Sequence, residues 1–507
     1  MSSQLPPSTR PRGDITTVLD RAQRDSQDGY FFPLNTQNSW FHRAPITQHP
    51  STLSIQEFAH KGTAQFGGRL TFELSSLQAG DLLQAVLLQI RLPHWLPTAQ
   101  VLQLEAGQIS PTLPTPPSVS PPYTYANCLG SSIIDYAEFE VGDQTIERIT
   151  GEFIQAFLAT FAYENSIIGF SIDGLGLGTL ADLATNSHGF SPQRPYPTQD
   201  GIYFCLLPFF FTRTRLKQTF PLLSVTEGSV RIHVQLRPFD QLIRSTTNTR
   251  QSCTQTPLSQ QFSFTTLPPA SQQFTVTAVS QPPLFQDFRI VTFTTLCTGS
   301  VRSSYLRAPF EVPVKLCQTF SFTEPLKFLA SKPNPNTDQV DISLPLELNN
   351  PVQEIIWIFR RKATQINNDW MNFSPIVETQ YSSSSFSQPW LAAASIRVNG
   401  ILLQEAEGDW WRWASSHVHR GGYGQYAKYI YGYSFARYPD EHQPSGSANM
   451  SRSQSVNLNL TVNVPKPVAV PAGFDAQVAQ GWEVQVYAIY WNWIRFQNGL
   501  CQMVFAN

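Results

Sequence analysis

His417 and His419 are the residues best placed to bind a metal ion in this chain of 507 residues. If the segment is a strand, a His-x-His pair puts both imidazoles on one face. Glu405, Glu407 and Asp409 lie close by in the sequence and add carboxylate oxygens. A complete site also needs a further histidine and carboxylate, which no motif in the sequence supplies. The alternative is a pair of solvated histidines in a loop.

Glu138 and Glu140 are the best candidates for acid and base catalysis. The alternating pattern of residues 133–141 predicts a strand that carries both side chains on one face. Paired carboxylates of this kind cleave glycosidic bonds. No second acidic strand is evident opposite them, however. Carboxylates on the exposed face of a sheet are the commoner explanation of the same pattern.

Residues 409–413, DWWRW, combine three indole rings with an arginine and an acid. Such rings stack on sugars, and aromatic and arginine side chains are enriched at the energetic centres of protein interfaces. We therefore expect a subunit interface here, with burial in a private core as the alternative. Two aromatic residues near the N-terminus are candidates for a similar docking role. The candidate interface residues are Trp410, Trp411, Arg412, Trp413, Trp40 and Phe41.

Residues 169–199 form a Gly-rich insert that contains GLGLGT at 174–179. A dinucleotide site needs a third glycine, but Thr179 stands in that place, and the neighbouring sequence is typical of strands and loops. We interpret the insert as a surface loop. The sequence contains no Gly-x-Ser-x-Gly elbow, Walker loop or HExxH helix.

The composition is that of a well-packed chain with few charges. Hydrophobic residues make up 41% and aromatic residues 12%, which excludes disorder of the whole chain. Charged residues are only 14%, against about a quarter in typical globular proteins. Neutral polar surfaces suit β-rich proteins and faces that become buried in assemblies. The net charge of −2 and the absence of a long Lys/Arg block disfavour direct binding of nucleic acid.

The six cysteines are scattered without CxxC or Cys/His ligand spacing. We expect reduced thiols in a protein made inside a cell. The N-terminus lacks the order of a signal peptide, and no apolar run has the length of a membrane-spanning helix, so neither secretory export nor membrane spanning is expected.

Alternating residues predict strands in both halves. Residues 230–237 alternate Val, Ile, Val and Leu with Arg, His, Gln and Arg, which indicates a half-buried strand. A sheet so apolar on one face needs a second sheet to cover it, which predicts a two-sheet architecture. Between Thr145 and Phe161 the apolar spacing predicts a helix instead, with Asp143 as its N-cap. Gly151 weakens that helix by about 1 kcal/mol.

Polar, Pro-rich stretches divide the chain. The expected layout is an N-terminal arm at 1–53, a first β domain at 54–245, a polar linker at 246–282 and a second β domain at 283–507. A Pro-rich stretch at 105–125 predicts a long exposed loop. The chain closes at 482–505 with an aromatic strand, an Asn-Gly turn and a final apolar run. No sequence repeat relates the two halves.

Blocks in both halves resemble the major capsid proteins of the large eukaryotic DNA viruses. In the first half LPFFF, FPLL and VRIHVQLRPF follow one another between residues 207 and 239 in the family's order. In the second half the similar blocks are NPVQEIIWIF at 350–359, YSFARYPDEHQPSGSANMSRS at 433–453 and NGLCQMVFAN at 498–507. The matched blocks cover most of residues 65–507, and none of them is catalytic.

This resemblance implies an all-β fold of two consecutive eight-stranded jelly rolls, a double jelly roll, with short helices and long surface loops. It also implies a structural protein without enzyme activity or cofactor, whose homotrimers are pseudo-hexameric capsomers of an icosahedral virion shell. The implied partners are neighbouring capsomers, minor capsid and penton proteins, and proteins associated with an internal membrane. The implied location is the virion, with assembly in the host cytoplasm.

Two alternatives remain on the residues alone. The first is a cupin-like or glycan-binding β-sandwich, an enzyme or lectin that uses His417, His419 and the nearby acids. The second is a minor capsid or spike protein with one adhesive domain, which fits less well because both halves carry shell-type patterns. A stable monomer with stoichiometric metal would favour the first alternative over a trimeric shell protein.

Overall fold

The computed structural model describes fifteen stretches of the chain. They are 51–62, 64–92, 123–125, 129–160, 201–213, 218–245, 287–307, 309–323, 339–366, 368, 370–375, 389–414, 429–439, 444–465 and 481–505. All of them belong to one compact unit, Pro50–Asn507. No helix within these stretches is long and apolar enough to cross a bilayer.

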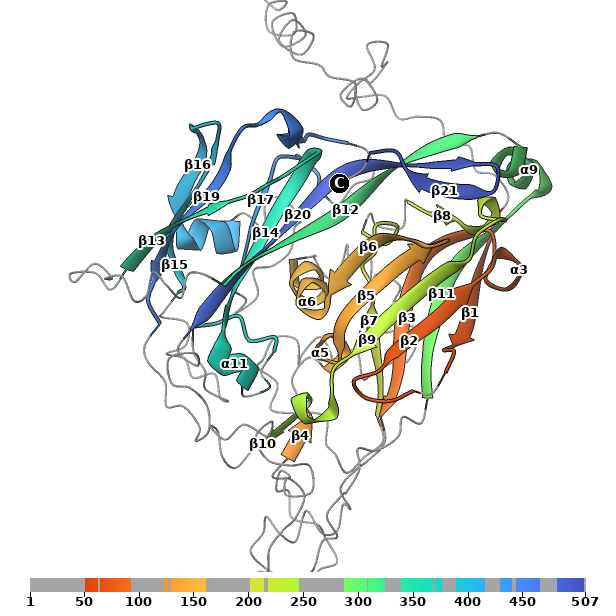
Figure 1. Cartoon of the computed structure of the whole chain (residues 1–507), viewed down its shortest axis with the longest axis horizontal. Helices are drawn as coiled ribbons and strands as arrows, with labels where there is room; N and C mark the ends of the chain where they lie inside the picture. Colours follow the sequence, from red (N-terminus) through yellow and green to blue (C-terminus); the bar gives the residue numbers. More distant parts are fainter. Residues whose placement is uncertain are drawn as a thin grey trace, which may run out of the picture. The chain divides into compact units, whose positions relative to one another are not determined.

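The first jelly roll is a pair of sheets packed face to face (Figure 1). One sheet contains, in spatial order, β1 (Ser51–Ala59), β11 (Asp287–Cys297), β3 (Leu82–Leu92) and β7 (Gly201–Leu206), with β8 (Phe220–Pro221) beside β3. The other contains β2 (Arg69–Leu74), β9 (Val230–Leu236), β5 (Ile134–Val141) and β6 (Gln144–Thr150). Phe72 of β2 stacks on Phe288 of β11 with ring centroids 6.0 Å apart, so the inner faces form one core.

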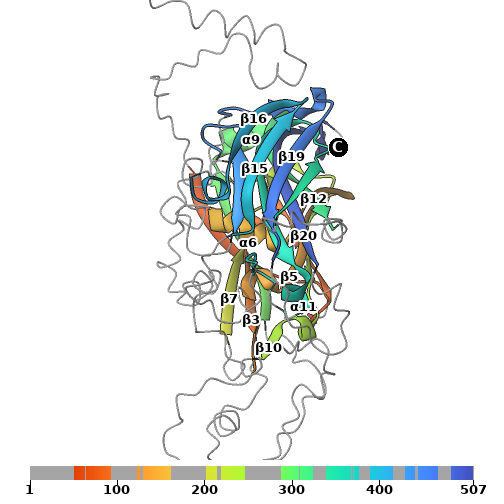
Figure 2. The ribbon, with the colours of Figure 1, turned by 90° about the vertical axis from the view of Figure 1, so that its left-hand side faces the viewer.

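The second jelly roll repeats this construction. One sheet contains β12 (Phe310–Phe322), β20 (Trp482–Gln497), β14 (Pro351–Arg361) and β17 (Ile430–Ser434), extended by β18 (Ala448–Asn449) and β21 (Leu500–Met503). The other contains β13 (Gln339–Pro345), β19 (Val456–Asn463), β15 (Leu391–Val398) and β16 (Ile401–Glu407), and Figure 2 shows β15 beside β19. Phe359 stacks on Trp390 with centroids 5.3 Å apart and joins the two sheets.

Short helices and one small ribbon complete the described elements. The helices are α3 (Ser76–Ala79), α5 (Leu129–Ser132), α6 (Gly151–Thr160), η5 (Leu222–Ser224), η6 (Phe239–Gln241), α9 (Gly299–Arg307), α11 (Lys362–Ile366), η9 (Trp410–Ala414) and η10 (Met450–Arg452). The ribbon pairs β4 (Tyr123–Tyr125) with β10 (Ile243–Ser245). The Pro-rich stretch before β4 and the Gly-rich insert 169–199 lie outside the described residues.

Strand order identifies both halves as jelly rolls. In the described part of each half, eight strands form the main sheets, and every pair is antiparallel. One sheet joins the first, eighth, third and sixth strands, and the other joins the second, seventh, fourth and fifth. The predicted all-β double jelly roll is therefore confirmed.

The expected domain boundary at residue 283 is wrong. The expected second domain includes β11, but β11 pairs with the whole length of β1 on one side and with β3 on the other. It is the eighth strand of the first jelly roll, because that sheet has no other partner between β1 and β3. Residues 246–282 therefore connect two strands of one jelly roll, and α9 leads from the first jelly roll to the second. β1 also begins at Ser51, inside the expected arm 1–53.

The predicted helix from Thr145 to Phe161 is half correct. Residues 144–150 form strand β6, which pairs with β5, and the helix α6 begins only at Gly151. At Gly151 an added Cβ would collide with the carbonyl oxygens of Ile134 and Ser131. The residue that was expected to weaken the helix is thus the one that lets the chain turn tightly from strand into helix.

The two jelly rolls also share their register, which no sequence repeat indicates. A bulge follows Phe139 in the β5–β6 pair and Ile396 in the β15–β16 pair, and these residues oppose Glu147 and Gln404. The hairpin turns that follow begin with Gly142 and Asn399, both at positive φ. A second bulge, between β5 and β9, has its equivalent between β15 and β19. Residues of β5, β6 and β9 therefore have position-by-position equivalents in β15, β16 and β19.

Candidate functional site

The sheet β12-β20-β14-β17 is covered on both faces. Ten of the eleven residues of β14 are buried. Trp357 and Phe359 point to the core of the second jelly roll, where Phe359 stacks on Trp390. Tyr487 of β20 points the opposite way and contacts Phe153 of α6, with ring centroids 5.1 Å apart. We call this second contact zone, formed by α6 and β6 against β12, β14 and β20, the seam.

Glu152 and Glu483 hold a buried charge cluster in the seam. Glu152, on α6, accepts hydrogen bonds from Arg237 of the first jelly roll at 2.8 Å and from Arg360 of the second. Arg360 also donates its Nε to Glu483 at 2.6 Å, and Lys362 reaches the other oxygen of Glu483 at 2.6 Å. The side chains of both carboxylates are no more than 6% exposed. The Glu152–Arg360 ion pair thus joins the two jelly rolls, and each of its members also has a counter-ion in its own half, Arg237 for Glu152 and Glu483 for Arg360.

The cluster predicts a loss of stability in acid. Burial alone raises the pKa of Glu152, but the charges of Arg360 and Arg237 outweigh it and lower that pKa below its ordinary value of 4.5. Arg360 and Lys362 likewise lower the pKa of Glu483. A lowered folded-state pKa gives stability that is complete above the ordinary value and is lost as the pH falls through the folded-state pKa. We expect the free energy of unfolding, measured by urea titration, to fall from about pH 5 downward.

The Glu152→Gln variant is the control for this prediction, because it removes one of the two titrating groups. Its unfolding free energy should fall less steeply between about pH 5 and pH 3 than that of the wild type. Equal slopes would contradict the assignment. The second buried carboxylate of the seam, Glu147, acts in the opposite direction, since its burial raises its pKa.

Glu147 is the centre of a second group of buried polar contacts in the seam. Its carboxylate pairs with Arg213 at 2.7 Å and accepts the backbone N–H of Phe210 and, from the second jelly roll, of Cys317, each at 2.9 Å. Arg213 also donates to the carbonyl of Lys315 at 2.8 Å. Both charged side chains are almost completely buried. Glu147 of β6 thus binds a backbone N–H of β12 across the seam, which fixes the position of β12 against β6.

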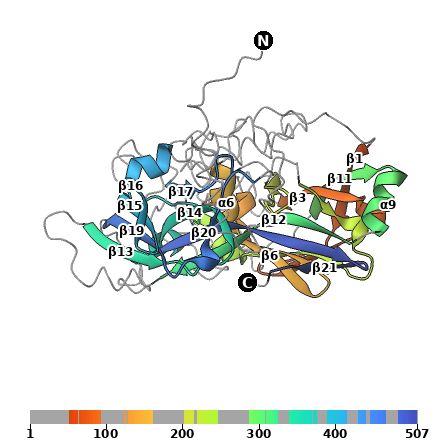
Figure 3. The same cartoon turned by 90° about the horizontal axis from the view of Figure 1, so that it is seen from above.

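The turn between β20 and β21 extends the contact toward α9 (Figures 1 and 3). Asn498 and Gly499 have positive φ, as the predicted Asn-Gly turn requires. The carbonyl of Gly499 accepts the backbone N–H groups of Thr226 and Glu227, each at 3.1 Å. The last strands of the chain therefore hold the first jelly roll as well as the second.

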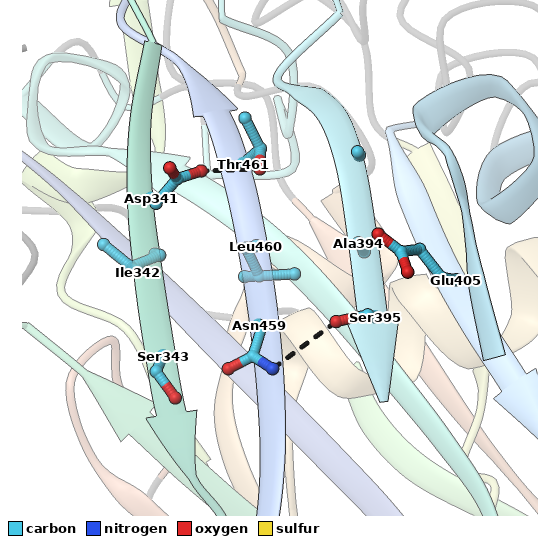
Figure 4. A pocket seen from close by; sticks show the side chains of 10 residues that line it. Asp341, Ile342, Ser343, Ala394, Ser395, Glu405, Asn459, Leu460 and Thr461 are labelled. Atoms are coloured by element: carbon cyan, nitrogen blue, oxygen red, sulfur yellow. Dashed lines mark hydrogen bonds between the residues drawn. The ribbon is translucent and has the colours of Figure 1, made fainter. Parts of the chain in front are cut away.

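A shallow groove of about 290 Å³ crosses the outer face of the sheet β13-β19-β15-β16 (Figure 4). Its floor is small and polar: Asn459 donates to Ser395 at 3.4 Å, and Thr461 donates to Asp341 at 2.6 Å. Asp341 and Glu405 stand on the two outer strands, three strand spacings or about 14 Å apart. Paired catalytic carboxylates need about 5 to 9.5 Å. The groove therefore does not have the geometry of a glycosidase site.

Glu138 and Glu140 lie on one face of β5, as predicted, but both are engaged in ion pairs. Glu138 accepts from Arg69 at 2.8 Å, and Glu140 pairs with Arg231 at 3.0 Å. His233 lies 3.3 Å from Glu140. The commoner explanation, a charged outer face of a sheet, applies to these two residues.

The segment 409–413 divides between core and surface. Trp411 is fully buried, contacts Trp357 with centroids 5.4 Å apart and donates its indole N–H to the carbonyl of Ala406. Arg412 is buried and lies over the ring of Tyr429 at 4.1 Å. The private-core alternative therefore applies to Trp411 and Arg412, and the interface prediction is wrong for them.

Trp410 is half-buried and remains a candidate for an interface. The side chain of Trp413 and the N-terminal Trp40 and Phe41 lie outside the described residues, as do His417 and His419. Of the acids near that histidine pair, Glu405, Glu407 and Asp409 are all exposed. Within the described stretches no three His, Cys, Asp or Glu side chains gather into a metal-binding group.

The cysteines that the structure describes are free thiols at four scattered positions. Burial raises the pKa of Cys205, Cys317 and Cys501 to about 12. These thiols stay protonated at neutral pH and are weak nucleophiles.

Two eight-stranded jelly rolls in tandem, locked together by a buried seam, define the class of double jelly-roll capsid proteins. Family models agree with this class along most of the chain. Residues 50–277 match the model described as major capsid protein N-terminus, and residues 317–501 match that of the large eukaryotic DNA virus major capsid protein. The chain belongs to the major capsid proteins of the large eukaryotic DNA viruses.

Curated relatives are similar over shorter segments. The major capsid protein of Phaeocystis pouchetii virus is 26% identical over 133 residues, which are 26% of this chain and 24% of that protein. The major capsid protein of Pyramimonas orientalis virus is 36% identical over 75 residues, 15% of each chain. The chain thus matches at most about a quarter of the length of these relatives.

Solved structures share the fold over nearly the whole chain. VP54 of PBCV-1 has a TM-score of 0.61 at 15% identity, covering 92% of this chain and 100% of VP54. The Faustovirus major capsid protein has a TM-score of 0.55 at 11% identity, covering 91% of this chain and 93% of its own. At these identities the likeness concerns the fold.

Proposed function

We propose that this chain is the structural subunit of a virion shell, and that three copies form a capsomer with a near-hexagonal outline. The observation that carries the proposal is the equivalence of the two jelly rolls in strand order and register. A chain with two equivalent halves supplies six equivalent units when three copies close into a ring. The seam holds the two halves of each chain in one fixed arrangement, which a regular tile requires.

The same proposal names the partners and the location of the subunit. Capsomers contact one another to tile an icosahedral shell, and minor capsid, penton and membrane-associated proteins bind to it. The protein is located in the virion after assembly in the host cytoplasm. Its role is mechanical, without catalysis, and family membership and the packing of the seam support this assignment.

Native mass spectrometry of the purified full-length chain tests the proposal. We expect a complex of three copies that persists at micromolar concentration, without bound metal. A stable monomer would contradict it. A monomer with one equivalent of zinc or iron would favour the metal-binding β-sandwich built around His417 and His419 instead.

A further inference from the structure

We propose that neighbouring copies of this chain contact each other through the equivalents of the seam. Strand β16 and the segment 408–410 of one copy would lie against β1 and the end of β3 in the next copy. This inference rests on the proposed trimer and names the surfaces that hold it together. Its basis is the shared register of the two jelly rolls, which gives Gly151, Glu152, Phe153 and Arg360 of the seam counterparts on the outside of the chain.

The helical segment of the seam has a close counterpart. In the first jelly roll, residues 151–153 are Gly-Glu-Phe and directly follow β6. In the second, residues 408–410 are Gly-Asp-Trp and directly follow β16. Added Cβ atoms at Gly151 and Gly408 would collide with the carbonyl oxygens of Ile134 and Leu391, which occupy equivalent places on β5 and β15, each next to a bulge. In both jelly rolls, therefore, an acid and an aromatic residue follow the glycine at the end of the fifth strand.

Arg360, which binds Glu152 in the seam, also has a counterpart. Within the chain, Glu152 binds Arg360 of β14, which lies opposite Glu483 of β20. The equivalents of β14 and β20 are β3 and β11, and there Arg91 lies opposite Asp287. In both sheets an arginine near the end of the third strand faces an acid at the start of the eighth.

The acid and the arginine of this second set are exposed. Asp409 and Arg91 both lie at the surface of the single chain, and Trp410 is half-buried beside Trp411. Glu152 and Arg360, in contrast, are buried against each other. The exposed pair has opposite charges, so Asp409 of one copy complements Arg91 of the next.

The flanking strands carry an independent indication. In the seam, β6 lies against β12, where Glu147 accepts the N–H of Cys317. The equivalents of these strands are β16 and β1, which are both edge strands of their sheets. Both carry large apolar side chains that are 42–68% exposed, and such residues mark protein contacts when they gather. These residues are Ile401, Leu402 and Leu403 on β16, and Leu53 and Ile55 on β1.

The two surfaces belong to different jelly rolls, so the contact between copies is head-to-tail. A head-to-tail contact closes into a ring when each step rotates by the same fraction of a turn. If the contact between chains repeats the contact within a chain, six jelly rolls meet at six equivalent junctions. Three of these junctions are covalently linked seams, and three lie between copies.

Charge reversal tests the junction in the full-length chain. Asp409→Arg and Arg91→Asp should each weaken association of three copies by about a hundredfold, and the double variant should recover most of it. Asp143→Arg is the matched control, because Asp143 is an exposed acid in a hairpin turn away from both surfaces. Sedimentation velocity gives the assembly state, and circular dichroism confirms that each variant is folded.

Disulfide trapping provides a second measurement. Asp409→Cys and Arg91→Cys chains, co-expressed and mildly oxidised, should form a covalent dimer that neither variant forms alone. Reversal variants that remain trimeric, together with no cross-link, would overturn this junction and leave the proposed trimer standing. A wild-type chain that is monomeric would overturn the proposed function itself, and the junction with it.

Discussion

Replacing Arg360 by methionine is expected to lower the free energy of unfolding by about 3–5 kcal/mol. Arg360 lies between Glu152 and Glu483, and its side chain is 11% exposed. Methionine keeps most of the side-chain volume but leaves two buried carboxylates with fewer partners. Removing one member of a buried ion pair costs more than the pair contributes, because the remaining charge stays desolvated.

Urea denaturation followed by tryptophan fluorescence measures this loss. Arg397→Met is the matched control, since Arg397 is exposed on β15, and its change should stay within about 0.5 kcal/mol. Because the cluster connects the two halves, the Arg360→Met variant should also separate a single unfolding transition into two. Equal midpoints for Arg360→Met and Arg397→Met would show that the cluster does not hold the jelly rolls together.

Replacing Gly408 by alanine should cost about 3 kcal/mol. An added Cβ at this position would collide with the carbonyl oxygen of Leu391, which belongs to a paired strand and cannot retreat without breaking the sheet. Gly151→Ala should cost a similar amount in the first jelly roll for the same reason. The comparison therefore also tests the equivalence of the two halves.

Gly299→Ala is the control for this second prediction. Gly299 begins α9, and no atom lies within 4 Å of an added Cβ there. Alanine at this helical position should leave stability unchanged or raise it by up to about 1 kcal/mol. Thermal unfolding of the three variants would contradict the account if Gly408→Ala or Gly151→Ala were as well tolerated as Gly299→Ala.

Much of the fold can be predicted from the sequence because alternation reports which face of a strand is buried. In β9 the predicted apolar face, Val230, Ile232, Val234 and Leu236, is buried, and His233 of the opposite face is buried as well. The prediction of a helix from Thr145 onward is wrong for residues 145–150, because their apolar spacing fits a helix as well as a strand. Ile146 and Ile149 fit a helical face, but the β5–β6 hairpin pairs Ala137 with Ile149 and makes the segment a strand.

The domain boundary could not be predicted by composition. A polar stretch between two apolar regions resembles a linker, whether it joins two domains or two strands of one sheet. Here it precedes the eighth strand of a jelly roll, and that strand can only be assigned once its partners β1 and β3 are known. The shared register of the two jelly rolls could not be predicted either. Burial requires an apolar side chain at a position but no particular residue, so the two halves need not be similar in sequence.

The seam was missed because its charged residues look like surface residues in the sequence. Glu152 lies in the first turn of a helix and Arg360 lies next to the end of a strand, where charges usually meet water. One signal was available: Glu354 and Arg360 flank residues 355–359, IIWIF, an unbroken apolar run that is typical of a strand buried on both faces. Such a strand requires a partner for each charge.

Electron microscopy of the purified full-length chain tests the central claim most directly. Class averages of single particles should show a three-fold particle with six lobes, two for each copy, and a reconstruction should contain six jelly rolls. A particle with two-fold symmetry, or isolated two-lobed molecules at micromolar concentration, would contradict the account.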